Sequence, residues 1–232
     1  MKARDEIQAL ANKEIAKHSL RFFKTAKGEY GHGDIFLGVR TPQIRLIAKK
    51  HIGISTTEMK TLIKSKYHEE RLLGLIILVN KYSKAKDEKS KNQLYKIYVS
   101  SFKYVNNWDL VDVTCPHIIG KHLMDNNRSI LYSWAKSDDL WTKRIAIVST
   151  HWFIRKNDLQ DTFKIAEMLL NDEHDLIHKA VGWMLREAGK RDLEKEEIFL
   201  KKHYKNMPRT MLRYSIEKFP EPKRQKYLKG KI

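Results

Sequence analysis

The sequence predicts an all-α protein built from helical repeats, and three observations lead to that prediction. Helix-breaking residues are sparse, with five prolines and ten glycines in 232 residues. Helix-favouring lysine, glutamate, leucine, alanine and isoleucine dominate, and the alternating pattern of a strand is rare. Similar short segments also recur along the chain. A hydrophobic fraction of 41% supports a folded core, so the chain is not a basic disordered tail.

Turn-forming clusters divide the chain into the predicted helices, in order from the N-terminus. These breaks lie at residues 28–38, 53–55, 83–87, 106–107, 125–127, 157–158, 171–173 and 207–208. Several contain Asn, Asp, Ser or Thr, whose side chains accept hydrogen bonds from the free N–H groups at a helix start. We expect helices of about 12–20 residues joined by short connectors.

Four of these helices open with the same kind of segment, a basic residue followed by apolar and small residues. The segments start at Arg71, Arg144, Lys179 and Arg209, separated by 73, 35 and 30 residues. The first separation is twice the others and contains Trp108 near its middle. A period in the middle thirties suits stacked helix pairs, and the signature residues of TPR repeats are absent. The sequence therefore predicts a single HEAT-like α-solenoid over residues 1–232.

The charge balance points to a polyanionic partner. Lysine and arginine number 46 against 28 acidic residues, which gives a formal net charge of +18. Nucleic acid and an anionic membrane surface are the two partners that fit such a charge. Residues 201–232 contribute half of the excess, with eleven basic residues against two glutamates.

Stacked repeats place equivalent residues on one face, so the repeated basic residues are expected to line a concave groove. Helix N-termini on that face would add backbone N–H groups suited to phosphate. The alternative for each of these residues is a helix cap paired with a neighbouring acid. Because the basic residues recur at equivalent positions of the repeats, a shared groove is the favoured interpretation.

Composition also excludes several classes of protein. The one cysteine, Cys115, permits neither an intramolecular disulfide nor a four-cysteine metal site, which fits a reducing compartment. The longest stretch without charged residues, 145–154, has ten residues, whereas a membrane span needs about 20. The first residues carry charge and have no apolar signal-peptide centre. We therefore expect a cytoplasmic protein that does not span a membrane, associated with the nucleoid when on DNA.

No metal or nucleotide motif is complete. His174 and His178 have the spacing that puts two ligands on one helical face, but the glutamate of an HExxH motif is missing. A partly exposed helix surface is the favoured interpretation. Phosphate-binding loops and the glycine pattern of dinucleotide sites are absent from the sequence. No metal and no cofactor is therefore predicted.

The segment 106–112 is the most informative one for chemistry. If Asn107 caps a helix, Trp108 and Asp112 are four residues apart and project side by side. Asp109 lies near the helix start, where a carboxylate complements the helix dipole, so it is the structural acid of the pair. A carboxylate repels DNA, so Asp112 in a basic groove is unexpected for a protein that only binds phosphate, and a chemical role is one of two interpretations. The alternative is that Asp112 pairs with Arg144 for stability.

Five stretches resemble the motifs of the AlkD-type DNA alkylation-repair glycosylases, a family of HEAT-like repeat proteins. They are the segments 36–45, 108–112, 141–144, 179–187 and 207–214, which follow one another in the family's order. The resemblance covers nearly the whole chain. It implies an α-solenoid that releases N3- and N7-alkylated purines from duplex DNA without a cofactor.

The resemblance also implies roles for individual residues. Trp108 and Trp183 correspond to the cleft wall against the sugar and backbone of the lesion, Asp112 to the catalytic carboxylate, and Arg144 to the arginine that contacts the DNA backbone. It further implies that the damaged base stays in the stack. The basic residues of the repeats and motifs are expected to bind DNA: Arg71, Lys143, Lys179, Arg186, Arg209 and Arg213.

Two other functions remain as alternatives. A non-catalytic HEAT-like scaffold that binds nucleic acid or senses damage explains the charge but not the Trp108–Asp112 pair. A protein–protein adaptor explains neither. We expect a monomer, because one concave groove serves each DNA site.

Overall fold

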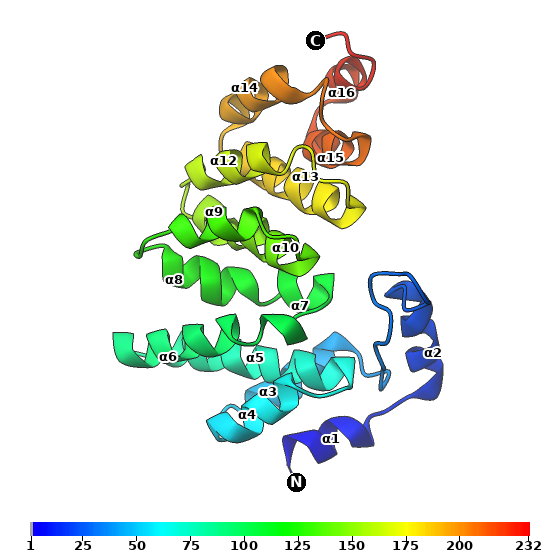
Figure 1. The fold of residues 1–232 in the computed structure, drawn as a ribbon, viewed down its shortest axis with the longest axis vertical. Coiled ribbons are helices and arrows are strands. Elements are labelled where there is room, and N and C mark those ends of the chain that lie inside the picture. Colours follow the sequence, from blue (N-terminus) through cyan, green and yellow to red (C-terminus); the bar gives the residue numbers. More distant parts are fainter. Residues whose placement is uncertain (1) are drawn as a thin grey trace. The chain divides into compact units, whose positions relative to one another are not determined.

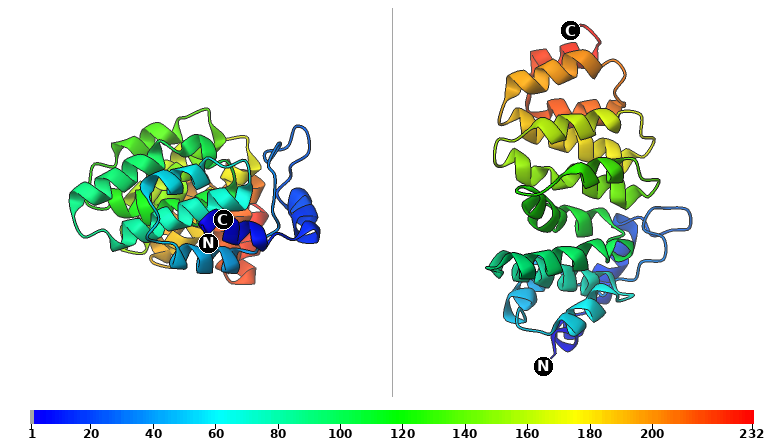
Figure 2. Two further views of the ribbon diagram at one scale, coloured as in Figure 1. Left: turned by 90° about the horizontal axis from the view of Figure 1, so that it is seen from below. Right: turned by 60° about the vertical axis from the view of Figure 1, so that its left-hand side comes forward.

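Helices make up all of the regular structure in the computed structural model, which describes residues 2–232. The predicted all-α helical-repeat fold is confirmed. Within the described range, the one contact of strand type is an isolated bridge between Ile35 and Tyr67. The chain divides into two compact units, the first ending at Thr114 and the second comprising Cys115–Ile232 (Figures 1 and 2). A single solenoid domain over 1–232, with a concave groove, stays a prediction.

The first unit is organised around its longest helix, α5. Its elements are α1 (Ala3–Ala9), α2 (Lys13–Phe22), α3 (Thr41–Lys50), α4 (Thr56–Ile63), α5 (His68–Lys84), α6 (Glu88–Val99), the 3₁₀ turn η1 (Phe102–Tyr104) and α7 (Trp108–Asp112). Helix α5 packs against α3, α4, α6 and α7, and α1 packs on α3 (Figure 1). Its run from Leu72 to Leu78 is buried, because both of its sides are covered by other helices.

The second unit stacks helix pairs around α10 and α13. Its elements are the π-helical turn η2 (Pro116–Gly120), α8 (Lys121–Leu123), α9 (Ser129–Ala135), α10 (Leu140–Ser149), α11 (His151–Ile154), α12 (Gln160–Met168), α13 (Asp175–Gly189), α14 (Leu193–His203), α15 (Arg209–Ser215), the 3₁₀ turn η3 (Ile216–Lys218) and α16 (Glu221–Leu228). Helix α10 packs against α9 and α13, and α13 packs against α12, α14 and α15. This succession of paired helices is the pattern that the recurring segments predict.

The basic residues of those segments mostly lie one turn inside their helices. Arg71 is the fourth residue of α5, and Arg144 and Lys179 are the fifth residues of α10 and α13. Only Arg209 opens its helix as predicted. In α5 and α13 the first turn contains acidic residues, which interact favourably with the positive end of the helix dipole.

Polar side chains cap several helix starts, as the sequence predicts. Ser55, Asp87 and Asn107 each accept a hydrogen bond from a backbone N–H of the first turn. The predicted helix length of about 12–20 residues is wrong for most helices, because further caps interrupt stretches that look continuous. Asp139 and Asp192 are two such caps, at α10 and α14. Among the helices of residues 2–232, only α5, α6 and α13 have 12 or more residues.

None of the helices in the described part of the chain has the length and apolar character needed to cross a membrane.

Candidate active site

The predicted pair Trp108 and Asp112 forms the two ends of α7, in the first unit. Asn107 is fully buried and caps the helix, its Oδ1 accepting from the Trp108 N–H at 2.9 Å. The predicted cap is confirmed. Four residues apart on one short helix, the indole and the carboxylate project from the same face, and both side chains are half-buried. Whether they act in catalysis stays a prediction.

Two phenylalanines that follow each other at the end of α2 hold the Trp108 indole. Phe23 stacks on it with ring centroids 5.4 Å apart, and Phe22 meets it edge-on at 5.8 Å. Phe22 is 55% exposed. This contact is not predicted from the sequence, because the phenylalanines lie more than 80 residues before Trp108.

Asp109 belongs to a buried network that joins three parts of the first unit. His68, the first residue of α5, is 1% exposed and lies between two carboxylates. Its Nε2 is 2.8 Å from Asp109 Oδ2 and its Nδ1 is 2.9 Å from Asp34 Oδ2. The prediction that Asp109 is a structural acid agrees with these contacts.

The pKa shifts of His68 and Asp34 favour the charged form of both groups. Burial disfavours the imidazolium of His68, but Asp109 and Asp34 outweigh that effect and raise its pKa to about 9. Burial likewise disfavours the Asp34 carboxylate, and its contacts with His68 and Arg71 nevertheless lower its pKa. Four polar residues at the start of an otherwise apolar helix, 68–71, are the one sequence signal of this network. The partners of His68 are 34 and 41 residues away, so the sequence could not identify them.

Arg71, a predicted DNA-binding residue, is occupied within that network. Its side chain is 4% exposed, forms an ion pair with Asp34 and donates to the carbonyl groups of Ser65 and Lys66. These contacts match the alternative of a cap paired with a neighbouring acid. A contact between Arg71 and phosphate stays a prediction that this geometry does not support.

Arg144 and Trp183, the other two predicted catalytic residues, belong to the second unit. Arg144 is 5% exposed and its Nη1 donates to the Leu176 carbonyl at 2.5 Å, which ties α10 to the first turn of α13. Trp183 is half-buried on α13 and lies 5.6 Å from the His151 ring. Burial lowers the pKa of His151, so a neutral imidazole faces the indole.

Glycine at position 182 lets α15 approach α13 next to Trp183. A β-carbon there would lie 2.5 Å from both the Met211 carbonyl oxygen and the Tyr214 β-carbon. Only glycine leaves room for the two backbones at this separation. The contact fixes the part of α13 that presents the indole.

Two more of the predicted DNA-binding residues have acidic partners. Lys143 forms an ion pair with Asp172, and Lys179 pairs with Asp175 at 2.7 Å, one helical turn away. The Lys179 pair is well exposed and solvent screens it, so a phosphate could displace the carboxylate at little cost.

The remaining three lie on α13 and α15. Arg186 forms an ion pair with Glu217. Arg209 and Arg213 are exposed and, within residues 2–232, have no ion-pair partner. Of the six predicted DNA-binding residues, these two are the most accessible to a phosphate.

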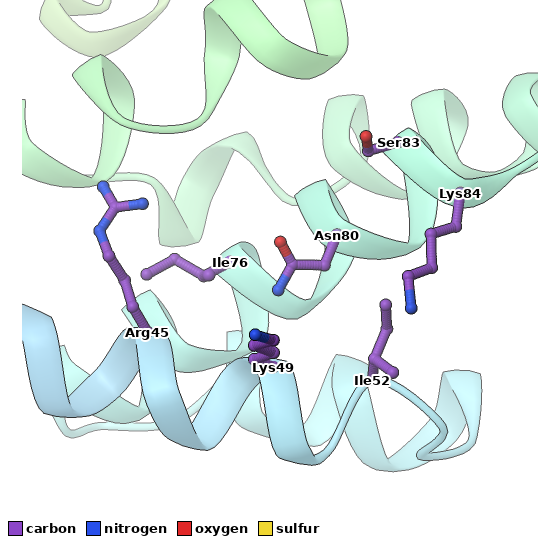
Figure 3. A pocket seen from close by; sticks show the side chains of 7 residues that line it. All are labelled: Arg45, Lys49, Ile52, Ile76, Asn80, Ser83 and Lys84. Carbon is purple, nitrogen blue, oxygen red and sulfur yellow. The ribbon is translucent and has the colours of Figure 1, made fainter.

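A basic cavity of about 370 Å³ lies between α3 and α5 in the first unit (Figure 3). Its lining combines cationic, amide, hydroxyl and aliphatic side chains: Arg45, Lys49, Ile52, Ile76, Asn80, Ser83 and Lys84. In Figure 3, Arg45 extends from α3 beside Ile76 of α5. In the described part of the chain, the cationic lining residues Arg45, Lys49 and Lys84 have no ion-pair partner. The cavity therefore offers positive charge to an anion, and no motif in the sequence predicts it.

The four predicted catalytic residues are thus divided equally between the two units. Within residues 2–232, no group of three histidine, cysteine or acidic side chains is arranged to hold a metal ion. The His174–His178 pair has structural contacts instead. His174 Nδ1 accepts from the Leu176 N–H, and His178 Nε2 contacts the Asp172 carbonyl.

The sequence and the fold are each similar to proteins described as DNA alkylation repair enzymes. The family model described as DNA alkylation repair enzyme matches residues 3–219. No curated protein matches the sequence. Among solved structures, the chain is similar to a predicted DNA alkylation repair enzyme from Enterococcus faecalis, with a TM-score of 0.72 and 15% identity. That match covers 91% of this chain and 97% of the other, and at this identity it shows a shared fold.

Proposed function

Because the chain belongs to the family of DNA alkylation repair enzymes, we propose that it is a monofunctional DNA glycosylase for cationic alkylpurines. The reaction is hydrolysis of the N-glycosidic bond of N3- or N7-alkylated purines, such as 3-methyladenine and 7-methylguanine, in duplex DNA. The observation that carries the proposal is the indole–carboxylate pair on α7, in a chain of net charge +18.

The chemistry of these lesions suits such a sparse site. Alkylation at N3 or N7 gives the purine a positive charge, so the base leaves without being protonated. A general acid is then unnecessary. As the bond breaks, the deoxyribose acquires oxocarbenium character, and a fixed carboxylate stabilises that charge and orients the attacking water. We assign this role to Asp112.

We assign contacts with the sugar–phosphate backbone to the other three residues. The electron-rich faces of Trp108 and Trp183 favour contact with a sugar that becomes cationic. We assign to the Arg144 guanidinium, whose side chain is anchored by the Leu176 carbonyl, a charge-assisted contact with a backbone phosphate. Base flipping is not required if the enzyme approaches from the backbone side.

The proposal is tested by incubating the purified protein with duplex DNA that contains a single 7-methylguanine. We expect free 7-methylguanine and an abasic site, with no strand cleavage by the protein itself. Unmodified duplex of the same sequence is the control. Tight binding to the damaged duplex without release of 7-methylguanine would support the non-catalytic scaffold instead.

We expect Arg144→Ala to weaken DNA binding about tenfold and to slow excision as well, since it removes a charge-assisted contact with the backbone. Affinity and single-turnover rate are measured on the same duplex, and folding is checked by thermal melting. Arg191→Ala, which removes an exposed arginine of the same unit, is the matched control. Wild-type affinity and rate in a folded Arg144→Ala variant would exclude Arg144 from the site.

DNA binding is expected to depend strongly on salt, because phosphate contacts dominate it. If about six phosphates are neutralised, log K falls against log salt concentration with a slope near −5. We include the cavity between α3 and α5 in this binding surface, because its lining supplies three cations, Arg45, Lys49 and Lys84, that have no ion-pair partner in the described part of the chain. A salt-insensitive affinity would contradict a binding mode based on phosphate contacts.

We therefore expect the triple variant Arg45→Gln, Lys49→Gln, Lys84→Gln to bind less tightly and to reduce the magnitude of the salt slope by about 3. A second cavity, between α4 and α6, supplies the matched control, because it is lined by three lysines, Lys60, Lys89 and Lys96. Their triple glutamine variant removes the same charge. Equal loss of affinity in both triple variants would mean that only net charge matters and that the α3–α5 cavity has no specific role.

A further inference from the structure

We propose that His68 is a positioning residue for the α7 site. It bridges Asp34 and Asp109 and thereby holds the helix that carries Trp108 and Asp112. This role in catalysis rests on the proposed function, and the holding of α7 can be measured independently of it. His68 itself touches neither Trp108 nor Asp112 through a hydrogen bond in the described structure.

His68 holds α7 through the carboxylate of Asp109. Both residues lie at helix starts, His68 at the first position of α5 and Asp109 at the second position of α7. Asp109 Oδ1 is buried and has no hydrogen-bond partner among the described residues. The other carboxylate oxygen, Oδ2, lies 2.8 Å from His68 Nε2. A buried carboxylate without a cation is costly, and removal of the imidazolium would therefore drive Asp109, and α7 with it, toward solvent.

The other charged groups around His68 are engaged elsewhere. Glu69 accepts from the backbone N–H groups of residues 37–39, and Glu70 accepts from Arg4 and Gln8. Arg71 forms an ion pair with Asp34 and donates a hydrogen bond to the Ser65 carbonyl, which precedes α5. No second cation contacts Asp109 in the described part of the chain. The imidazolium of His68 is thus the cation that balances the negative charge of Asp109.

The ring of His68 makes a second connection to the site, through aromatic stacking. It lies 4.6 Å from the Phe36 ring and 5.0 Å from the Phe23 ring. Phe23 in turn stacks on Trp108 at 5.4 Å. A change at His68 therefore reaches α7 by two routes, one through Asp109 and one through the indole.

The protonation of His68 makes this arrangement sensitive to pH. Its pKa is raised to about 9 by Asp109 and Asp34 against the opposing effect of burial. For a histidine with a raised pKa, the stabilisation is complete below the unfolded value of 6.5 and disappears as the pH rises through about 9. We therefore expect excision to decline on the alkaline side, near pH 9.

The test compares variants that separate charge from ring shape. His68→Phe keeps the aromatic ring and loses the charge, whereas His68→Lys keeps a cation between the carboxylates and loses the ring. We expect the single-turnover excision rate at pH 7 to fall about 10- to 100-fold in His68→Phe, since small displacements of catalytic groups are that costly. His68→Lys should retain more activity than His68→Phe.

Asp109→Asn provides a milder variant, in case His68→Phe does not fold. It keeps an acceptor for the imidazole but removes one of the two charges that raise the pKa of His68. The alkaline limb of the excision profile should shift to lower pH in Asp109→Asn, and in His68→Lys it should move above pH 9. A residue that only supports the fold would change the melting temperature without moving this limb.

Hydrogen exchange of the amides of residues 108–113 measures the holding of α7 without reference to catalysis. We expect at least tenfold faster exchange there in His68→Phe, with the amides of α4 unchanged. If the wild-type protein releases no base, the glycosylase proposal fails, and hydrogen exchange still decides the role of His68. Wild-type exchange in α7 together with an unmoved alkaline limb would overturn the positioning role.

Discussion

Asp112→Asn is expected to lower the single-turnover excision rate about 10²- to 10³-fold, the usual loss for an electrostatic group at a developing charge. DNA binding should survive or improve, because the substitution removes a negative charge from a basic protein. The loss arises because stabilisation by the carboxylate is available only as the sugar becomes cationic. Rate and affinity are measured on one defined duplex, and folding is followed by thermal melting.

Asp109→Asn is the control for that experiment, because it removes a second carboxylate from the same helix. That carboxylate contacts His68. At pH 7 it should cost less in rate and some stability. The effect of Asp112→Asn should also be larger for 7-methylguanine, the less labile lesion, than for 3-methyladenine. A folded Asp112→Asn protein with the wild-type rate, or one that cannot fold at all, would favour a structural ion pair over catalysis.

Glu196→Gln is expected to stabilise the protein strongly at alkaline pH. Glu196 is 2% exposed in α14, and burial, with a smaller effect of Glu197, raises its pKa to about 8 against the attraction of Arg186. Its Oε1 has no hydrogen-bond partner among the described residues, and a β-carbon at residue 189 would lie 1.6 Å from Oε2. Glycine at position 189 therefore makes room for the carboxyl group.

The direction of the pH effect follows from the raised pKa. The folded state favours the neutral acid, so the contribution of Glu196 to stability is complete below pH 4.5 and is lost as the pH rises toward 8. At pH 8 the ionised side chain costs about 3–5 kcal/mol. Removing that cost should raise the melting temperature by roughly 5–10 °C.

Thermal melting between pH 5 and pH 8.5 checks this expectation. The wild-type and variant curves should converge at pH 5 and separate at higher pH. Glu194→Gln, an exposed position two residues earlier in the same helix, should leave the pH dependence as it is in the wild type. Parallel wild-type and Glu196→Gln curves over the whole range would show that Glu196 is ionised in the folded protein.

The sequence alone determined the fold class and the local geometry of α7. Both depend on short-range features: few helix breakers, recurring segments, and an asparagine that caps the helix between Trp108 and Asp112. Cap hydrogen bonds and the four-residue spacing on a helix are local, so they can be predicted from neighbours in the chain. Helix lengths were predicted less well, because caps such as Asp139 and Asp192 look like ordinary surface residues in the sequence.

Which charged residues have a partner follows from the packing of distant segments and not from local sequence. Arg71 and Arg209 open similar sequence segments, yet Arg71 is buried against Asp34 and Arg209 is exposed. The partners of His68 likewise come from a loop and a helix 34 and 41 residues away. Such pairs form because packing removes water from distant groups at once, and a buried charge must then find an opposite charge wherever the chain supplies one.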